Sequence, residues 1–265
     1  MSRSSFPLAL AAALALVPAA APAQVKPGWK ATFPAEYKHV ALESAGAYTA
    51  GSVTLNLDSL GANMMEPNTT GKWTIVPDAR EPSKGRLIYR DPVSGVKMRG
   101  PNDIPERLGG TLASMATVNQ VLGDTKVSTM VNVTGGPDGK GSLSRQGPML
   151  RWNGSTQYLA CFVDFAMGTT YLWAGRTAVT YETLGKAVPI KGFANTKPYR
   201  VELTMIGQTA RCQVFDGQAL VADSGEIQEP KTPARGVAGV LLEISLKKPE
   251  QPLEGSFSEI SAVTP

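Results

Sequence analysis

Apolar and polar residues alternate along many short segments of this chain, most clearly in its second half. Residues 158–165 (YLACFVDF) place Leu159, Cys161 and Val163 on one side of an extended segment. Successive strand side chains point to opposite faces, so a period of two predicts a half-buried β-strand. Similar segments, bounded by Gly, Pro, Asn or Asp, are residues 51–57, 72–76, 86–89, 125–134, 148–152, 170–174, 199–206, 210–215, 236–246 and 256–263.

The residues between these segments are typical of turns. The chain has 27 glycines and 20 prolines, and dipeptides such as Asp216–Gly217 fit tight hairpin turns. Many short strands joined by such turns predict an all-β fold, an antiparallel β-sandwich with little helix. The exception is residues 105–122, where leucines mix with small residues and we expect a helix.

The beginning of the chain reads as an export signal. Arg3 precedes an apolar run, residues 8–17, which Pro18 ends, and small residues lead to Ala23. A bilayer-spanning helix needs about 20 apolar residues, so we expect a cleaved signal peptide at residues 1–23 rather than a membrane anchor. No later stretch is long and apolar enough to span a membrane. Residues 24–265 then form one β-sandwich domain, periplasmic or secreted.

Charge argues against nucleic acid as a partner. The net charge is +4, and it falls to +3 when the leader with Arg3 is removed. The Lys and Arg residues are scattered, whereas nucleic-acid binding needs a concentrated basic patch.

The two cysteines, Cys161 and Cys212, both fall on the apolar side of predicted strands. An exported chain meets oxidising conditions, which favours a disulfide between them. Two buried free thiols remain the alternative. A zinc site is not expected, because one histidine and two isolated cysteines do not supply the usual ligands.

Familiar catalytic patterns are missing from the sequence. His39 is the one histidine, no Gly-x-Ser-x-Gly segment accompanies it, and no dinucleotide-binding or phosphate-binding glycine motif is present. A glycosidase can work with two carboxylates, but spacing alone pairs none of the acids. The catalytic residues therefore stay unknown. The acids on or beside strands are Asp164, Glu182, Glu202, Asp216, Glu243 and Glu259.

An ordered series of motifs runs through residues 125–263. It comprises GPMLR at 147–151, an Asn-Gly turn, YLAC at 158–161, YRVEL at 199–203, Asp216–Gly217 and GVAGV at 236–240. This order resembles the concanavalin A-like lectin/glucanase (jelly-roll) superfamily, with laminin G-like or 3-keto-disaccharide hydrolase-type domains as the nearest members. Residues 26–119 carry no family signature, and the usual opening motif of the hydrolase-type domains is absent.

The resemblance implies a concave sheet that binds sugar, with Arg151 lining it. Because Arg151 and Trp152 are neighbours in one strand, both can face the groove only if a bulge intervenes. A structural calcium ion at a loop is common in this superfamily. No Asp-rich loop requires one here, so we expect no cofactor and leave a structural calcium open.

Aromatic residues gather beside this segment. A sugar site needs rings against the apolar face of the sugar and polar side chains for its hydroxyls, and the expected ligand is an oligosaccharide or polysaccharide. Alternatively, the rings pack the core or cover a sheet edge, as aromatic residues usually do. The predicted ligand-binding residues are Arg151, Tyr158, Asp164, Tyr171 and Trp173.

Two functions are compatible with these sequence features. The first is an exported protein that binds or processes carbohydrate, and its enzymatic form would be a glycoside hydrolase or lyase. The second is a non-catalytic envelope protein that uses the sandwich for protein contacts or scaffolding. A deep groove with paired acids favours an enzyme, whereas a flat or filled aromatic face favours binding or scaffolding.

Overall fold

The computed structural model describes residues 29–30, 40–42, 47–50, 53–60, 72–77, 85–91, 111–133, 144–153, 157–176, 181–245 and 253–263. Every regular element in these ranges is a β-strand, and the strands form two antiparallel sheets. This confirms the predicted all-β antiparallel sandwich.

One sheet has ten strands. They are β1 (Trp29–Lys30), β2 (Val40–Leu42), β5 (Lys72–Pro77), β6 (Gly85–Asp91), β8 (Thr125–Val133), β13 (Tyr199–Ile206), β14 (Thr209–Asp216), β15 (Ala219–Asp223), β16 (Ile227–Gln228) and β18 (Leu253–Val263). Their order is β15-β14-β13-β8-β18-β6-β5-β2, while β1 pairs with β18 and β16 with β14.

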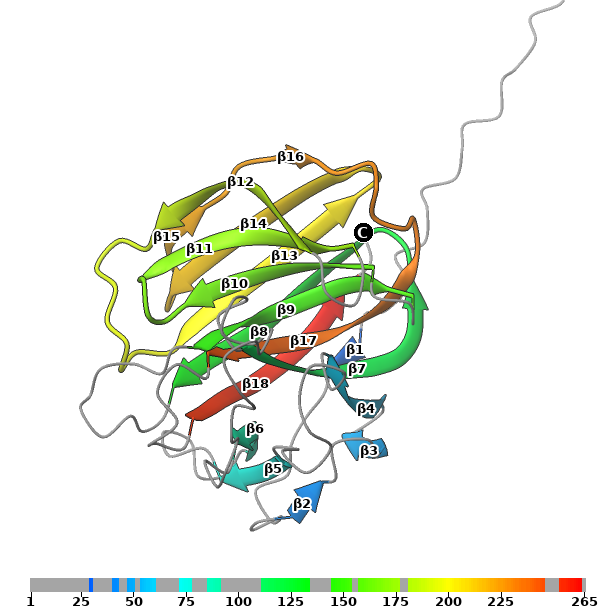
Figure 1. Cartoon of the computed structure of the whole chain (residues 1–265), viewed down its shortest axis with the longest axis vertical. Helices are drawn as coiled ribbons and strands as arrows, with labels where there is room; N and C mark the ends of the chain where they lie inside the picture. Colours follow the sequence, from blue (N-terminus) through cyan, green and yellow to red (C-terminus); the bar gives the residue numbers. More distant parts are fainter. Residues whose placement is uncertain are drawn as a thin grey trace, which may run out of the picture.

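The other sheet has eight strands. They are β3 (Ala47–Ala50), β4 (Val53–Leu60), β7 (Thr111–Leu122), β9 (Ser144–Trp152), β10 (Tyr158–Asp164), β11 (Thr169–Gly175), β12 (Tyr181–Pro189) and β17 (Gly236–Ser245). Their order is β12-β11-β10-β9-β17-β7-β4-β3. Figure 1 shows β10 and β11 of this sheet crossing over β13 and β14 of the other, and these strands contact each other.

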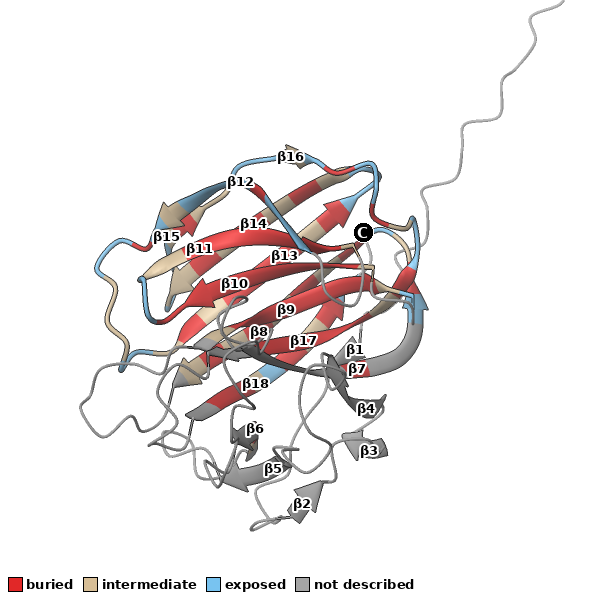
Figure 2. Ribbon diagram, viewed as in Figure 1, coloured by how far each residue is buried: buried red, intermediate tan, exposed pale blue. Residues whose placement is uncertain are grey.

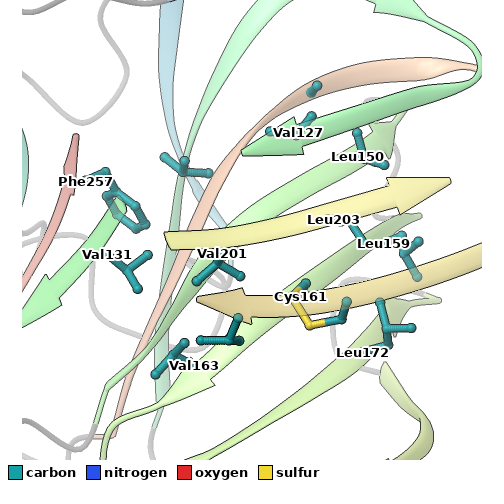
Figure 3. Packing of buried hydrophobic residues seen from close by; sticks show 14 of the residues in the cluster. Val127, Val131, Leu150, Leu159, Cys161, Val163, Leu172, Val201, Leu203 and Phe257 are labelled. Atoms are coloured by element: carbon teal, nitrogen blue, oxygen red, sulfur yellow. A yellow bond between two sulfur atoms is a disulfide. The ribbon is translucent and has the colours of Figure 1, made fainter. Parts of the chain in front are cut away.

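The core lies between the two sheets. Alternation in β10 sends Leu159, Cys161 and Val163 inward, where they meet residues such as Val201 and Leu203 of β13 (Figure 3). All five side chains are fully buried. Buried residues run along the middle of β10, β11, β13 and β14, while the edge strand β12 is mostly exposed (Figure 2). The sequence prediction of which β10 side chains point inward is therefore confirmed.

A disulfide joins the two sheets across this core. Cys161 of β10 is bonded to Cys212 of β14, and their Cα atoms are 5.5 Å apart, inside the range that disulfides span. The prediction that these cysteines are bonded is confirmed. The cross-link closes a loop with a sequence separation of 51 residues, which restricts the unfolded chain.

The prediction of a helix at residues 105–122 is wrong in the part that the structure describes, residues 111–122. Residues 111–122 form strand β7, which pairs with β17 on one side and with β4 on the other. Helix propensity is a weak preference, and pairing on both sides of a strand overrides it.

The expected signal peptide, residues 1–23, lies outside the described residues. Within the ranges that are described, no helix has the length and apolar character needed to cross a membrane.

Ion pairs hold the edge strand β12 to its surroundings. Arg176, just after β11, donates from its two Nη atoms to both carboxylate oxygens of Glu229, over 2.9 and 2.7 Å, and also bonds to Glu182 of β12. Glu229 is buried and accepts further hydrogen bonds from the backbone N–H groups of Lys231 and Thr232. Burial raises the pKa of Glu229, but the hydrogen bonds and charge of Arg176 together with the backbone hydrogen bonds from Thr232 and Lys231 hold that pKa below its ordinary value.

Removing the disulfide should destabilise the sandwich. We expect the Cys161→Ala/Cys212→Ala variant to lose about 2–4 kcal/mol of unfolding free energy, because its unfolded chain is no longer cross-linked. Urea denaturation, followed by tryptophan fluorescence, measures the change. Reductant should shift the urea midpoint of the wild type towards that of the variant. A wild-type midpoint that stays the same with and without reductant would contradict a stabilising role of the disulfide.

Acid should weaken the fold through Glu229. A carboxyl with a lowered folded-state pKa stabilises the fold above its unfolded pKa, about 4.3, and this stability is lost as the pH falls through the folded value. The Glu229→Gln variant should lose about 2 kcal/mol near neutral pH and show a weaker loss of stability below about pH 4.3.

Glu182→Gln is the matched control, because it removes an exposed partner of the same Arg176. Denaturation midpoints between pH 3 and pH 7 make the comparison. Equal pH profiles for wild type and Glu229→Gln would refute the assignment.

Candidate functional site

The second face of the eight-stranded sheet carries an aromatic cluster. Side chains from β9, β10, β11 and β17 pack together there, on the side opposite the core. We name these residues, with the adjoining Trp152, the outer aromatic cluster. Its members are Met149, Tyr158, Ala160, Phe162, Tyr171, Trp173, Leu241 and Trp152.

The β10–β11 hairpin brings the rings together. In its register Phe162 lies opposite Tyr171 and Ala160 lies opposite Trp173, so the aromatic positions of the two strands share one face. The centroid of Phe162 is 5.2 Å from that of Trp173, edge to face, and 6.1 Å from that of Tyr171. Both distances are typical of favourable aromatic pairs.

The rings are packed rather than open. Phe162 has no exposed surface, Trp173 is 4% exposed, and Tyr158 and Tyr171 are each 9% exposed. Tyr181, on the neighbouring edge strand β12, is 50% exposed and meets Trp173 edge to face at a centroid distance of 4.0 Å. Tyr181 therefore extends the cluster to a ring that solvent reaches.

Asp164 anchors one end of the cluster. Its Oδ2 accepts a hydrogen bond of 3.0 Å from Nε of Arg145, which lies opposite it on β9. Its Oδ1 accepts from the backbone N–H groups of Ala166 and Met167 in the β10–β11 turn, each at 3.0 Å. Such a bond from Asp to the backbone two residues on stabilises a turn. One carboxylate thus fixes both the turn and Arg145.

Arg145 reaches from this anchor across the aromatic face. The carbon at the centre of its guanidinium lies 5.8 Å from the ring centroid of Tyr171 and 5.7 Å from that of Trp173. These distances fit cation–π contacts. The Arg145 side chain is 35% exposed, so a positive charge lies between the aromatic rings and solvent.

Among the described residues of this face, two buried hydrogen-bond donors have no acceptor. The indole Nε1 atoms of Trp152 and Trp173 are buried and make no hydrogen bond. Leaving a buried polar group unpaired costs about 1–3 kcal/mol, and buried indole N–H groups usually find a partner. The face therefore has two donors that a ligand could satisfy.

Arg151 does not lie with the other predicted site residues. Its guanidinium points to the ten-stranded sheet, where Nη1 donates to the carbonyl of Gly207 at 2.9 Å and Nη2 to Asp124 at 3.1 Å. Both partners are in turns that flank strands of that sheet. Burial lowers the pKa of Arg151, and the charge of Asp124 partly opposes this shift.

A bulge explains this placement. Trp152 pairs with Val237 but Met149 pairs with Gly239, so β9 has one more residue than β17 between these two pairs. Arg151 has a φ of 57°, the left-handed region that non-glycine residues rarely adopt. The bulge turns Arg151 towards the other sheet, while Trp152 packs against the outer aromatic cluster.

The structure therefore brings together four of the five residues that the sequence singled out. Tyr158, Asp164, Tyr171 and Trp173 share the outer face, and Arg151 is separate from them.

Arg145 and Tyr181 also belong to this face, although the sequence pattern did not indicate them. Arg145 and Met149 are four residues apart in β9 and therefore share a face. The predicted strand began only at residue 148, so the sequence analysis did not place Arg145 in it. Tyr181 lies on an edge strand whose exposed residues do not alternate.

The described side chains of this face combine packed rings with one ion pair. Asp164 is the one carboxylate whose described side chain lies there, and it is already engaged by Arg145 and the turn. Glycoside hydrolysis requires two such groups. Among the described residues, no group of three or more His, Cys, Asp or Glu side chains could hold a metal ion.

Comparison with known proteins finds likeness in structure only. No protein family matches the sequence, and no curated protein is similar to it. Solved structures do match. A carbohydrate binding module, CBM66 from Bacillus subtilis, shares 12% identity over 74% of this chain and 98% of its own, with a TM-score of 0.46.

Two further structures give similar values. The GH43 protein BlXynB from Bacillus licheniformis, a K247S mutant, shares 12% identity over 73% of this chain and 37% of its own, with a TM-score of 0.45. The exoplasmic/lumenal domain of VIP36, in its form bound to Ca²⁺ and Man3GlcNAc, shares 10% identity over 58% of this chain and 74% of its own, with a TM-score of 0.44. These values are too low to argue for a shared function, so the fold class rests on the strand pairing itself.

Proposed function

We propose that this protein is an exported, non-catalytic carbohydrate-binding β-sandwich that holds an oligosaccharide or polysaccharide on the outer aromatic cluster. One observation carries the proposal. Trp173, 4% exposed, presents an indole N–H without an acceptor, beside the half-exposed ring of Tyr181 and the charged pair Arg145–Asp164.

Each part of this arrangement has a role that sugar chemistry uses. A pyranose has an apolar face of C–H groups that packs on an aromatic ring, and Tyr181 offers such a ring to solvent. The oxygen atoms around a pyranose ring accept hydrogen bonds. The indole N–H of Trp173 has no acceptor in this structure, so a sugar oxygen can supply one. Ligand sites commonly combine apolar rings with a few placed polar groups.

Binding at Trp173 requires a side chain above it to move. Arg145 is the described residue that lies over both Tyr171 and Trp173. Long charged side chains change conformation readily at a surface, and a cation–π contact at an exposed site contributes only about 0.5–1 kcal/mol. We expect the Arg145 guanidinium to turn away from the Trp173 ring while Asp164 still holds its Nε, and to become a ligand contact, while Tyr181 meets the ligand first.

Export is part of the proposal. The expected leader at residues 1–23 and the disulfide between Cys161 and Cys212 both fit a periplasmic or secreted protein. The motif order in residues 125–263 supports membership of the concanavalin A-like jelly-roll superfamily. The filled ring cluster and the engaged carboxylate of Asp164 favour a binding protein over a hydrolase.

A glycan array tests the function. We expect the mature protein, beginning at Gln24, to bind a subset of glycans, and Tyr181→Ala to weaken the binding about tenfold through loss of the stacking ring. Trp173→Ala should abolish detectable binding. Calorimetry gives the affinities, and thermal melting identifies variants that fail to fold.

Phe215→Ala is the matched control. Phe215 is a partly buried ring on β14 of the ten-stranded sheet, where it contacts Arg200, and its loss should leave glycan affinity unchanged. Absence of binding to every glycan by the folded wild type would overturn the proposal. So would full affinity in folded Tyr181→Ala and Trp173→Ala proteins, which would leave protein contacts as the function of this surface.

A further inference from the structure

We propose that the group bound beside Trp173 is a carboxylate, so that the ligand is a glycan containing uronic acid residues. This inference rests on the proposed function and narrows its ligand class. It follows from the kind of polar atoms that the outer face leaves without partners, and from the charge fixed next to them.

Among the described residues, the unpartnered buried polar atoms of this face are both donors. They are the Nε1 atoms of Trp152 and Trp173, and an indole N–H can donate but cannot accept. Trp152 is on β9 and Trp173 is on β11, and β10, which carries Tyr158, lies between these two strands. A complementary ligand must supply acceptors at this position.

The charged acceptor described on this face is already occupied. Asp164 accepts three hydrogen bonds, from Nε of Arg145 and from the backbone N–H groups of Ala166 and Met167. A carboxylate offers about four acceptor positions, so Asp164 has little capacity left. A sugar hydroxyl must also donate its own hydrogen, and the neutral side-chain acceptors described in the buried part of this face are the hydroxyls of Tyr158 and Tyr171.

A carboxylate needs no hydrogen-bond acceptor from the protein. When ionised it only accepts, which matches donors that only donate. Hydrogen bonds to an ionised group are also roughly twice as strong as those between neutral groups. An acetamido carbonyl would accept as well, but it carries no charge.

Arg145 selects the charged acceptor over the neutral one. Its guanidinium lies 5.7 Å from the Trp173 ring centroid, and its side chain is 35% exposed. A carboxylate that accepts from Trp173 approaches this cation, which also holds the Asp164 carboxylate, at the edge of a buried ring cluster where charges interact more strongly than in water. Charge and donor pattern thus favour the same ligand group.

The test compares acidic oligosaccharides with their own methyl esters. Short oligomers of galacturonate, glucuronate, mannuronate and guluronate are each titrated calorimetrically beside the fully methyl-esterified form, which has the same sugars and no charge. We expect at least one acid form to bind about tenfold or more tightly than its ester. Its affinity should fall as sodium chloride rises from about 20 to about 500 mM, because salt screens the charge, while that of the ester should not.

Two variants connect this preference to the site. Trp173→Phe keeps a ring but removes the N–H, and it should weaken binding of the acid form about tenfold or more. Arg145→Gln should weaken binding of the acid form more than binding of the ester, so that the ratio of the two affinities falls towards one. Phe215→Leu, on the other sheet, should alter neither affinity. Melting temperatures within a few degrees of wild type establish that the variants are folded.

The outcomes separate this inference from the broader function. Neutral glycans or methyl esters that bind as tightly as every acid form would overturn the carboxylate while carbohydrate binding stands. Preference for sulfated neutral glycans over all uronates would also overturn it. Failure of every glycan to bind removes both proposals. If Trp173→Phe is folded and keeps full affinity for the acid form, the carboxylate is not at this indole.

Discussion

Strand β10 is buried on both of its faces, and this double burial determines how the rest of the structure is arranged. On one face Leu159, Cys161 and Val163 pack into the core between the sheets. On the other, Tyr158, Ala160 and Phe162 form the middle of the outer aromatic cluster. A sandwich normally exposes the outer face of each sheet as a polar surface. Here the eight-stranded sheet has apolar material on both sides.

The outer cluster depends on one carboxylate at the end of β10. Asp164 holds the β10–β11 turn and Arg145 at the same time, and the turn sets the register that aligns Phe162 with Tyr171. Arg145 in turn lies against the rings of Tyr171 and Trp173. Asp164 therefore determines both the geometry of the hairpin and the position of the Arg145 guanidinium. This coupling makes the face a defined binding surface in our proposal rather than a loose apolar patch.

The sequence predicted the sandwich because alternation is a property of the chain itself. Strands β10, β13 and β14 were found nearly to the residue, since each has an apolar parity and a turn beside it. Strand β7 was mistaken for a helix because its two neighbours, β17 and β4, are distant in sequence. Edge strands such as β12 were not predicted. An edge strand pairs on one side only, and the residues of β12 are mostly exposed, so apolar and polar residues do not alternate along it.

The candidate site was predictable in part, for a related reason. Parity placed Tyr158, Asp164, Tyr171 and Trp173 on a common face, which needs only local information. The contact between Arg145 and Trp173 crosses the β10 strand, and that of Tyr181 needs β12 to be paired beside β11. Such contacts depend on strand order, which a period of two does not encode. Arg151 was placed by the family resemblance instead, and a resemblance in motif order does not encode the bulge that turns this side chain towards the other sheet.

That bulge has a consequence for how the chain tolerates insertions and deletions. Gly236 lies against it so closely that a Cβ there would come within 2.3 Å of the carbonyl carbon of Arg151. The extra residue of β9 thus lies in a space that a glycine on the neighbouring strand leaves open. Deleting Arg151 would restore one-for-one pairing between β9 and β17 and would keep the Trp152 indole outward, because Met149 and Trp152 would then be two positions apart. A length change of a single residue would therefore leave the outer face as it is and remove the link that Arg151 makes to Gly207 and Asp124.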